Sequence, residues 1–327
     1  PAPDLFPEYS SVTIRVIRQP RMWTHRGLGP AVIRDRPDVL FVPAHVIPWP
    51  GVGGVPAVVT VHDLGYLHYP DKHPLPDRLY LDWSTRYSAR NARRVIAVSQ
   101  VTRHDLVHLN HIPPSKVSVI YSGVDDLLEP VADAQRLAEI RQRIGVDGRY
   151  ILHVGSIQPR KNLLRLVQAF DMIRDEFPDV SLVLAGQMGW GYRRLLREIR
   201  QDGLSRRVIM PGYVPDSNLA ALYSGAAVYA FPSLYEGFGF PALEAMRCGA
   251  PVVCANASSL PEIAGDAALT FAPTDVNALA GALRQVLTDQ ALRQTLVERG
   301  LARAAQFTWG NAARATLETL LEAASGV

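Results

Sequence analysis

Short apolar runs alternate with helical patterns along almost the whole chain. The runs are rich in β-branched residues and bounded by turn residues, and several are apolar at every position, as expected for strands buried on both faces of a parallel sheet. We predict strands at Val12–Val16, Val39–Val42, Ala57–His62, Val95–Val98, Val117–Ile120, Tyr150–Val154, Ser181–Ala185, Val208–Met210, Ala227–Phe231, Val252–Ala255 and Ala268–Phe271. Strands that alternate with helices in this way predict an α/β fold with parallel sheets covered by helices.

The chain of 327 residues is long for one core and suits two domains of ordinary size. Between the two groups of predicted strands lies a charged, mostly helical stretch at 125–148, which suits a linker plus one helix. We place the domain boundary near Pro130. The last stretch predicts an amphipathic helix that is anchored by Phe307 and Trp309 and packs across the domain junction. The predicted parts of the chain are therefore 1–130, 131–306 and 307–327.

Composition and charge narrow the class of protein. A hydrophobic content of 48% with 20% charged residues indicates a soluble globular protein. No apolar run approaches the length of a transmembrane helix, and the first ten residues do not resemble a signal peptide, so we expect a cytoplasmic protein. The formal charge is only +3 and acids interrupt the arginines, so we expect no nucleic-acid partner, whereas weak contact with an anionic membrane surface fits the charge.

The strongest candidate for chemistry is the segment 234–244, in which two carboxylates flank a Gly-Phe-Gly loop. The proline after this loop suits the first helical position, so we expect Glu244 in the first helical turn and Glu236 in the preceding loop. Gly237 and Gly239 let backbone N–H groups approach a phosphate at the helix N-terminus. A carboxylate beside a phosphate must face hydroxyl groups, which a ribose or a sugar supplies. The alternative needs no ligand: Glu236 would be an ordinary acidic residue of the loop, and Glu244 would interact favourably with the dipole at the helix N-terminus.

The second candidate is the Gly-Ser-Ile-Gln-Pro-Arg-Lys-Asn turn at 155–162, which follows a predicted strand and precedes a predicted helix at 163–177. Cations at this place in an open α/β sheet could neutralise a departing diphosphate. Only three of the 34 basic residues are lysines, so Lys161 beside Arg160 is suggestive, because a compact ammonium fits where a planar guanidinium does not. A solvated pair of loop cations is the alternative. A third candidate is His62, followed by Asp63 at the end of an apolar strand.

Together these motifs resemble the group-1 (glycogen-synthase-like, family 4 type) retaining glycosyltransferases, and within them the bacterial mannosyltransferase-like branch. The Ser-Gly-Val-Asp sequence at 122–125 and the Leu-Pro-Glu-Ile-Ala-Gly sequence at 260–265 add to the resemblance, which extends from about Asp38 to Phe307. It implies a GT-B fold, in which two Rossmann-like doubly wound domains face each other across a cleft. It also implies transfer of a hexose, mannose or glucose, from a GDP- or UDP-linked donor to an acceptor hydroxyl, with retention and without a metal or other cofactor.

The resemblance also implies roles for individual residues. Glu236 would contact the transferred sugar near its reacting carbon, and His62 would touch that sugar from the first domain. Glu244 would hold the ribose, while Arg160 and Lys161 would bind the diphosphate. Backbone contacts with the phosphates and contacts with the base would come from Gly155, Gly237, Phe238, Gly239 and Val214. Many family members have arginine directly after the turn glycine, where this chain has Ser156, so we expect Arg160 to replace it.

The N-terminus departs from the family pattern. Family members begin with a strand, a Gly-rich loop, a helix and a second strand that we do not find before Asp38. A parallel sheet without a central strand leaves backbone groups unpaired at the adjacent strands. We therefore predict a complementing N-terminal segment outside the chain, self-association, or a loosened first domain. The same departure keeps open a noncatalytic or hydrolysis-only protein that binds nucleotide sugars.

Two further patterns suggest other activities. His104-Asp-Leu-Val-His108, with His111 nearby, is similar to a zinc-protease motif, but its aspartate is one methylene shorter than the glutamate such proteases use as a base. A turn of a surface helix explains this pattern more simply.

The glycines of 186–191 are similar to a dinucleotide fingerprint, but their order differs and no acid follows the next strand. The two cysteines, Cys248 and Cys254, form no disulfide framework or zinc site, and we expect both to be buried hydrophobes.

Overall fold

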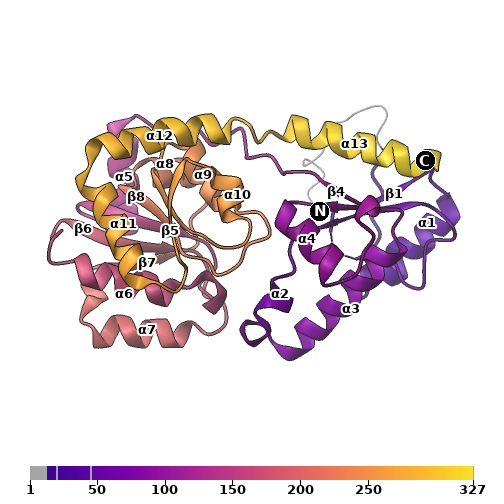
Figure 1. Cartoon of the computed structure of the whole chain (residues 1–327), viewed down its shortest axis with the longest axis horizontal. Coiled ribbons are helices and arrows are strands. Elements are labelled where there is room, and N and C mark those ends of the chain that lie inside the picture. Colours follow the sequence, from indigo (N-terminus) through magenta and orange to yellow (C-terminus); the bar gives the residue numbers. More distant parts are fainter. Residues whose placement is uncertain (1–12, 20, 45, 327) are drawn as a thin grey trace.

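The computed structural model describes residues 13–19, 21–44 and 46–326, which form two parallel sheets lying side by side (Figure 1). The first sheet has the order β1-β2-β3-β4, and the second has the order β10-β9-β8-β5-β6-β7. The strands are β1 (Leu40–Val42), β2 (Ala57–Val61), β3 (Arg94–Ala97), β4 (Val117–Val119), β5 (Arg149–Val154), β6 (Val180–Ala185), β7 (Val208–Gly212), β8 (Val228–Phe231), β9 (Val252–Ala255) and β10 (Ala268–Phe271). All pair in parallel, which confirms the α/β prediction.

One predicted strand is wrong. Val12 lies outside the described residues, and Thr13–Val16 is coil. A strand needs a neighbour to accept its backbone hydrogen bonds, and this segment instead interacts through side chains with the helical region after it. Arg15 pairs with Asp35 in this way, while the Ile14 and Val16 side chains stay exposed. The β-branched pattern was therefore not sufficient to make a strand.

Two helices of the first region precede β1, and the others follow β2 and alternate with the remaining strands. They are the π-helix η2 (Trp23–Leu28), α1 (Gly29–Asp35), α2 (Gly65–His68), α3 (Leu75–Asn91) and α4 (Gln100–His108), with short 3-10 turns η3 (Pro70–Lys72) and η4 (Pro114–Lys116). The four strands and these helices form an ordered unit with its own apolar core. A loosened first domain is not observed in the described residues, while a complementing segment or self-association stays a prediction.

The second region carries most of the helices. They are α5 (Ala134–Ile144), α6 (Leu163–Ile173), α7 (Tyr192–Gln201), α8 (Asp216–Ser224), α9 (Phe240–Arg247), α10 (Leu260–Ala264), α11 (Val276–Thr288) and α12 (Gln290–Ala304), with 3-10 turns η5 (Pro159–Lys161) and η6 (Leu204–Arg206). In Figure 1, α12 runs along one side of the second sheet, and α6 and α7 lie on the other. Among the described residues, no helix is both long and apolar enough to cross a bilayer.

The last helix, α13 (Trp309–Ser325), leaves the second region and lies against the first sheet (Figure 1). It begins after Thr308, whose hydroxyl accepts a hydrogen bond from the Asn311 N–H and so caps the first turn. Its Ala312 and Ala323 pack with three residues of the first sheet and its loops, Val58, Ile96 and Ile120. The chain thus crosses between the two regions twice, once before α5 and once after α12.

The second sheet reverses its winding at β5. From β5 the chain adds β6 and β7 on one side, and then returns to add β8, β9 and β10 on the other side. The loops after β5 and β8 therefore leave adjacent strands in opposite directions, which opens a crevice at the carboxyl ends of the strands. The four described strands of the first sheet follow one another in order and show no such reversal.

Candidate active site

The two strongest candidate motifs meet at this crevice. The turn 155–162 follows β5, and the loop 232–239 follows β8, the neighbour of β5 across the reversal. Ligands of open α/β sheets bind at such a reversal because the diverging loops leave room there. The sequence motifs therefore lie at the position that the sheet topology favours for a ligand.

Three charged side chains from these two loops form a compact cluster. The Lys161 ammonium donates a hydrogen bond to Oε1 of Glu236 at 2.7 Å, and Arg160 Nη1 lies 3.2 Å from Oε2 of the same carboxylate. Arg160 also donates to the Tyr235 carbonyl. Lys161 is 7% exposed and Glu236 is 8% exposed, so both charges depend on each other for compensation. Lys161, Arg160 and Glu236 are thus a buried ion cluster, not a solvated loop pair.

The protonation states in and beneath this cluster follow from burial and the two cations. Burial alone would raise the pKa of Glu236, but Lys161 and Arg160 lower it by more, so the carboxylate is charged. Behind them, His153 of β5 is fully buried. Burial and the nearby Lys161 lower its pKa to about 4, so the ring is neutral at pH 7. Its Nδ1 donates to the Ala230 carbonyl at 3.1 Å, and its Nε2 is buried without a hydrogen-bond partner in the described part of the chain.

Glycines let the loops after β5 and β6 pack against each other. A Cβ atom on Gly186 would lie 2.0 Å from the carbonyl oxygen of Gly155, and one on Gly191 would lie 2.7 Å from Pro159 Cγ. Gly155 has φ of +150°, which favours glycine. The glycines that resembled a dinucleotide fingerprint therefore support the turn that carries Arg160 and Lys161.

Side chains from the loop after β9 hold the backbone around Glu236. The Glu236 N–H donates to Ser258 Oγ at 2.7 Å. The buried Ser259 hydroxyl lies 2.9 Å from the Glu236 carbonyl oxygen and 2.7 Å from that of Phe238. Phe238 is also buried, against Phe240. The Gly-Phe-Gly loop is consequently fixed in place before any ligand binds.

Glu244 occupies the helix α9, one turn later than we expected. The helix begins at Phe240, so Pro241 is at its second position and Glu244 falls in the second turn. Gly239, with φ of +117°, precedes the helix as its N-cap. The Tyr223 hydroxyl donates to Glu244 Oε2 at 2.7 Å, and burial raises the pKa of Glu244 despite this bond. Glu244 is positioned by a partner that the sequence motif did not contain.

His62 reaches the cleft from the first region. It directly follows β2, is exposed, and has Nε2 2.8 Å from the Pro43 carbonyl oxygen. A Cβ atom on Gly237 would lie 1.8 Å from the His62 carbonyl oxygen, so only glycine fits between the two loops. Val214 is buried in the loop after β7, next to the exposed Tyr213. The predicted site residues thus lie on loops after β2, β5, β7 and β8 and on α9.

Sequence reasoning missed a set of contacts that joins the two regions. The Tyr235 hydroxyl donates to Oδ2 of the buried Asp105 at 2.6 Å, and His68 Nε2 lies 2.8 Å from the same oxygen. The rings of His68 and Tyr235 are stacked, with centroids 4.9 Å apart. We call this group of three residues the Tyr235 latch. It connects α2 and α4 of the first region to the residue that precedes Glu236.

A second interdomain contact lies at the start of α4. The Glu262 carboxylate of α10 accepts hydrogen bonds from the N–H groups of Gln100 at 2.7 Å and Val101 at 3.4 Å. Ser99, the N-cap of α4, donates its hydroxyl to the Gly237 carbonyl at 2.6 Å. Glu262 was visible in the sequence as part of the Leu-Pro-Glu-Ile-Ala-Gly motif, but that motif alone did not indicate its partner.

The residues of the zinc-like motif have other roles. Asp105 belongs to the Tyr235 latch, and the rings of His104 and His108 stack on each other at 4.0 Å. Within the described ranges, no group of three or more His, Cys, Asp or Glu residues could hold a metal ion. Cys248 and Cys254 are both buried thiols, as predicted. Burial raises the pKa of each to about 12, so neither is a reactive thiolate at pH 7.

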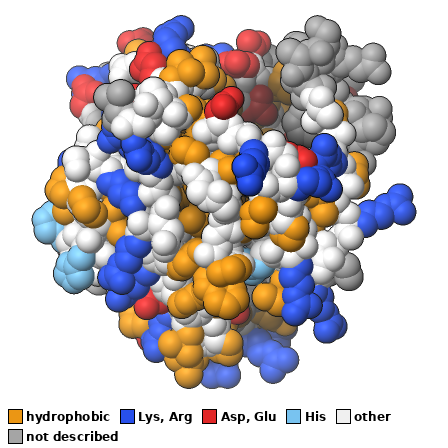
Figure 2. All heavy atoms as spheres, turned by 90° about the vertical axis from the view of Figure 1, so that its right-hand side faces the viewer, with side chains coloured by type: hydrophobic (Ala, Val, Ile, Leu, Met, Phe, Trp, Pro, Cys, Tyr) orange, Lys and Arg blue, Asp and Glu red, His pale blue; other side chains and the backbone are white. Residues whose placement is uncertain are grey.

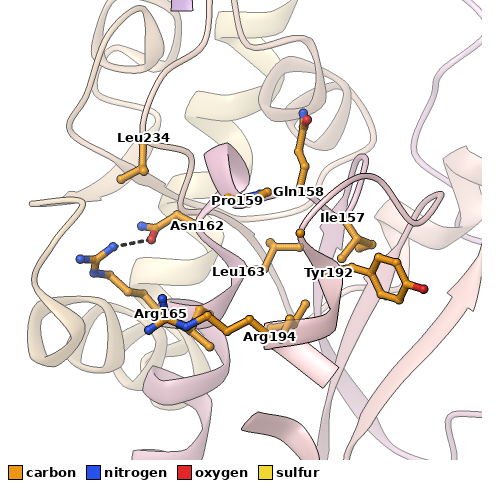
Figure 3. Close-up of a pocket in the computed structure, with 12 residues that line it drawn as sticks. Ile157, Gln158, Pro159, Asn162, Leu163, Arg165, Tyr192, Arg194 and Leu234 are labelled. Carbon is orange, nitrogen blue, oxygen red and sulfur yellow. Dashed lines mark hydrogen bonds between the residues drawn. The ribbon is translucent and has the colours of Figure 1, made fainter. Parts of the chain in front are cut away.

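A separate hollow of about 150 Å³ lies beside the turn after β5 (Figure 3). Figure 3 shows Arg165 pointing to Asn162, and its Nη1 donates to Asn162 Oδ1 at 2.7 Å. The other side chains around it are mainly apolar, with Tyr192 and Arg194 at the start of α7. Arg160, Lys161 and Glu236 do not line this hollow, so it is distinct from the ion cluster.

Comparison with known proteins identifies the family of the chain. The sequence profile described as glycosyl transferases group 1 matches residues 136–303, and that of glycosyltransferase family 4 matches residues 6–126. The chain is 35% identical over 265 residues to the O-antigen chain mannosyltransferase B of Escherichia coli, covering 80% of this chain and 69% of that protein. It is 31% identical over 284 residues to the serotype-specific mannosyltransferase WbdA of Escherichia coli, covering 85% of this chain but only 34% of WbdA.

Solved structures give the same result for the fold. The crystal structure of HepE from Anabaena in complex with UDP matches with a TM-score of 0.74 over 90% of this chain and 82% of HepE, at 23% sequence identity. At that identity the likeness concerns the fold alone. Together with the two profiles, it confirms the predicted GT-B arrangement of two Rossmann-like domains.

Proposed function

The chain belongs to the group 1 glycosyltransferases, and from this premise we propose that it transfers a hexose, mannose in the first instance, from a nucleotide-diphosphate sugar to a saccharide hydroxyl. The named relatives are mannosyltransferases, and the first of them acts, by its name, on an O-antigen chain. HepE was solved with UDP, which supports a nucleotide-linked donor. GDP- and UDP-linked mannose and glucose are the donors to test.

The buried ion cluster is the observation that carries the proposal. A nucleotide sugar brings a diphosphate with two negative charges, and Lys161 and Arg160 offer two cations on one turn at the crevice. In the ligand-free protein the single Glu236 carboxylate pairs with both cations and leaves one positive charge uncompensated within the cluster. When the donor binds, the diphosphate oxygens would take over as their partners, which makes charge-assisted hydrogen bonds in a site already shielded from water.

The same residues suit transfer with retention. The bond between the sugar carbon C1 and the diphosphate oxygen would break, and its electron pair would stay on the diphosphate, where Lys161 and Arg160 stabilise it. The acceptor hydroxyl would attack C1 on the same face and give its proton to the leaving phosphate oxygen. The Glu236 carboxylate, freed from the cations, would lie beside the sugar and offset the positive charge at C1. His62 would touch the sugar from the first region.

Metal-free operation is part of the proposal. In transferases that bind Mg²⁺ or Mn²⁺, the cation neutralises the departing diphosphate. Here two side chains on one turn, Arg160 and Lys161, would supply that charge. Glu244 on α9, fixed by Tyr223, would accept hydrogen bonds from the ribose hydroxyls of the donor.

A transfer assay tests the proposal. The protein is incubated with each of the four donors and a mannose oligosaccharide in the presence of EDTA, and nucleotide release is measured with and without the oligosaccharide. We expect oligosaccharide-dependent release with one donor, and an α-linked product by NMR. Release without product would identify a donor hydrolase, and binding without release a noncatalytic protein. A β-linked product would contradict retention, and a strict requirement for added Mg²⁺ would contradict the metal-free proposal.

A further inference from the structure

A second hollow, outside the candidate active site, lies on the first region and has a volume of about 560 Å³. Its wall is formed by Met22, Trp23, Thr24, His25, Trp49, Tyr80 and Trp83. We call it the aromatic hollow. The side chains of its four large aromatic residues, Trp23, Trp49, Tyr80 and Trp83, are between 44% and 52% exposed. Large apolar side chains that are exposed together in one cluster mark binding sites in soluble proteins.

The rings come from three separate segments, and three neighbouring rings contact Trp83. Trp83 of α3 stacks on Tyr87 with centroids 5.7 Å apart and lies 6.3 Å from Tyr80. The His25 ring, from η2, meets Trp83 edge-on at 6.4 Å. Trp49 belongs to the loop after β1. The aromatic hollow is therefore a tertiary feature, which a sequence pattern could not reveal.

Hydrogen bonds hold the Trp23, His25 and Tyr87 rings in place. Trp23 Nε1 donates to the Ile17 carbonyl at 3.0 Å, and the Trp49 N–H donates to His25 Nδ1 at 3.0 Å. Because Nδ1 accepts, the neutral His25 ring carries its proton on Nε2 and is a donor on its other side. The Tyr87 hydroxyl donates to the Pro48 carbonyl at 3.3 Å, so the ring beneath Trp83 is fixed as well.

Fixed aromatic faces with polar groups at their edges suit a sugar ring. A pyranose has an apolar face of C–H groups that lies flat on indole or phenol, and hydroxyl groups at its rim. Thr24, His25 and Tyr80 also line the hollow and bring polar groups to it that can bond sugar hydroxyls. The indole N–H groups of Trp49 and Trp83 have no hydrogen-bond partner among the residues the structure describes. Membrane-anchoring tryptophans project from a surface, whereas these two line a hollow, and Trp83 stacks on Tyr87.

The chain connects the aromatic hollow to the candidate active site. The loop after β1 carries Pro43, whose carbonyl oxygen contacts His62, and six residues later it carries Trp49. Six residues span at most about 20 Å, so the aromatic hollow lies within the reach of one oligosaccharide whose end is at His62. Figure 2 shows the face at the right-hand side of Figure 1, where hydrophobic side chains gather over the middle and lower part with Lys and Arg beside them.

We propose that the aromatic hollow binds a remote part of the saccharide acceptor by stacking sugar rings on Trp49, Tyr80 and Trp83. This site rests on the proposed function, because it presupposes a saccharide acceptor. It would hold the acceptor chain while its terminal hydroxyl lies in the cleft. Its residues are binding residues for the acceptor, and they make no contact with the donor.

Tryptophan fluorescence tests the proposal on the full chain. Mannotetraose is titrated into the wild type, Trp83→Ala, Trp83→Phe and Trp49→Ala, with Trp190→Ala as the control because this exposed tryptophan lies in the second region. Loss of one stacked ring should raise the Kd about fivefold to tenfold. Trp83→Phe should restore most of the affinity, and Trp190→Ala should leave the Kd unchanged. Titration of UDP and GDP into each variant checks that the protein is folded and that its donor site is intact.

Kinetics supply the second measurement. For Trp83→Ala, the KM for mannotetraose should rise about fivefold to tenfold, while the KM for a monosaccharide acceptor and for the donor stay unchanged. Equal affinity of Trp83→Ala, Trp49→Ala and the wild type for mannotetraose would overturn the proposal. So would Trp83-dependent binding to phosphatidylglycerol vesicles without saccharide binding, because it would identify a membrane contact. If UDP and GDP also fail to bind the wild type, the proposed function fails as well.

Discussion

The ion cluster of the second region and the aromatic hollow of the first region are built from opposite kinds of side chain. In the second region, Lys161 and Glu236 are buried charges that neutralise each other within two loops. In the first region, the loop after β1 carries Trp49, which lines a hollow of exposed rings. A diphosphate is the same in every nucleotide sugar and needs fixed cations, whereas a saccharide acceptor varies and is bound by shape and stacking. Two regions that each contain a parallel sheet thus carry surfaces suited to different ligands.

The two regions also meet in a specific way. The Tyr235 latch and the contact of Glu262 with α4 both attach the loops around Glu236 to the first region. The backbone on both sides of Glu236 is therefore held against the first region, through the Tyr235 hydroxyl on one side and the Gly237 carbonyl on the other.

The largest expected effect is on the charged end. Lys161→Ala should lower kcat/KM for transfer about 100- to 1000-fold, because it removes a preorganised charge from the leaving group and leaves Glu236 with one cation. Lys116→Ala is the matched control, since Lys116 contacts the Arg90 carbonyl in the first region. Initial rates of nucleotide release measure both variants. An equal loss of kcat/KM in the two lysine variants would contradict a specific role of Lys161 in stabilising the leaving group.

The buried His153 beneath the ion cluster should make the free energy of unfolding depend on pH. Its folded pKa of about 4 is below the ordinary 6.5, so the unfolded chain binds the proton first as pH falls. At about 1.4 kcal/mol per pKa unit, the free energy of unfolding should drop by about 3 kcal/mol from this group between pH 6.5 and pH 4. Urea unfolding across this range should show a smaller drop in His153→Gln. His104→Gln, on the surface, should behave like the wild type; a full drop in His153→Gln would contradict the prediction.

The Tyr235 latch can be weakened by a substitution that changes no side chain of the ion cluster or of the aromatic hollow. Tyr235→Phe keeps the stacking on His68 but removes the hydrogen bond to the Asp105 carboxylate, which should lower the free energy of unfolding by about 1.5 to 3 kcal/mol. Chemical denaturation measures the change, and Tyr213→Phe is the control because its exposed ring lies outside the latch. If both variants have the same stability as the wild type, the latch does not hold the two regions together.

The smallest expected effect concerns Glu262. Its carboxylate lies at the N-terminus of α4, where the helix dipole favours negative charge. Glu262→Gln should cost about 0.5 to 1 kcal/mol, and less at high salt, because part of the interaction is a screened charge effect. The surface Glu298→Gln variant should show neither the loss nor the salt dependence. A salt-independent loss in Glu262→Gln would indicate packing and not charge.

Local patterns predicted much of the fold and the charged end. The strands β9 and β10 are at the predicted residues, because each is an apolar run bounded by turn residues. Lys161 and Glu236 were predictable as site residues because each lies in the loop after a predicted strand, whereas their pairing depends on the strand order that the structure shows. The strand predicted at Val12–Val16 failed because a β-branched run says nothing about whether a neighbouring strand is present.

Features that depend on docking were beyond the sequence. Asp105 and Tyr235 are 130 residues apart and meet only when the two regions pack together. The aromatic hollow joins η2, α3 and the loop after β1, and each ring alone looks like an ordinary exposed aromatic residue. In such cases the signal is the convergence of several segments, and a one-dimensional pattern does not contain it.

Calorimetric titration of UDP and GDP in EDTA tests most directly whether the cations of the turn after β5 bind the diphosphate. The proteins to compare are the wild type, Lys161→Ala, Glu236→Gln and the control Lys116→Ala. We predict metal-free binding that Lys161→Ala weakens at least about tenfold and that Glu236→Gln retains, since the carboxylate competes with the diphosphate for the same cations. Equal affinity of Lys161→Ala and the wild type would contradict a diphosphate site at this turn.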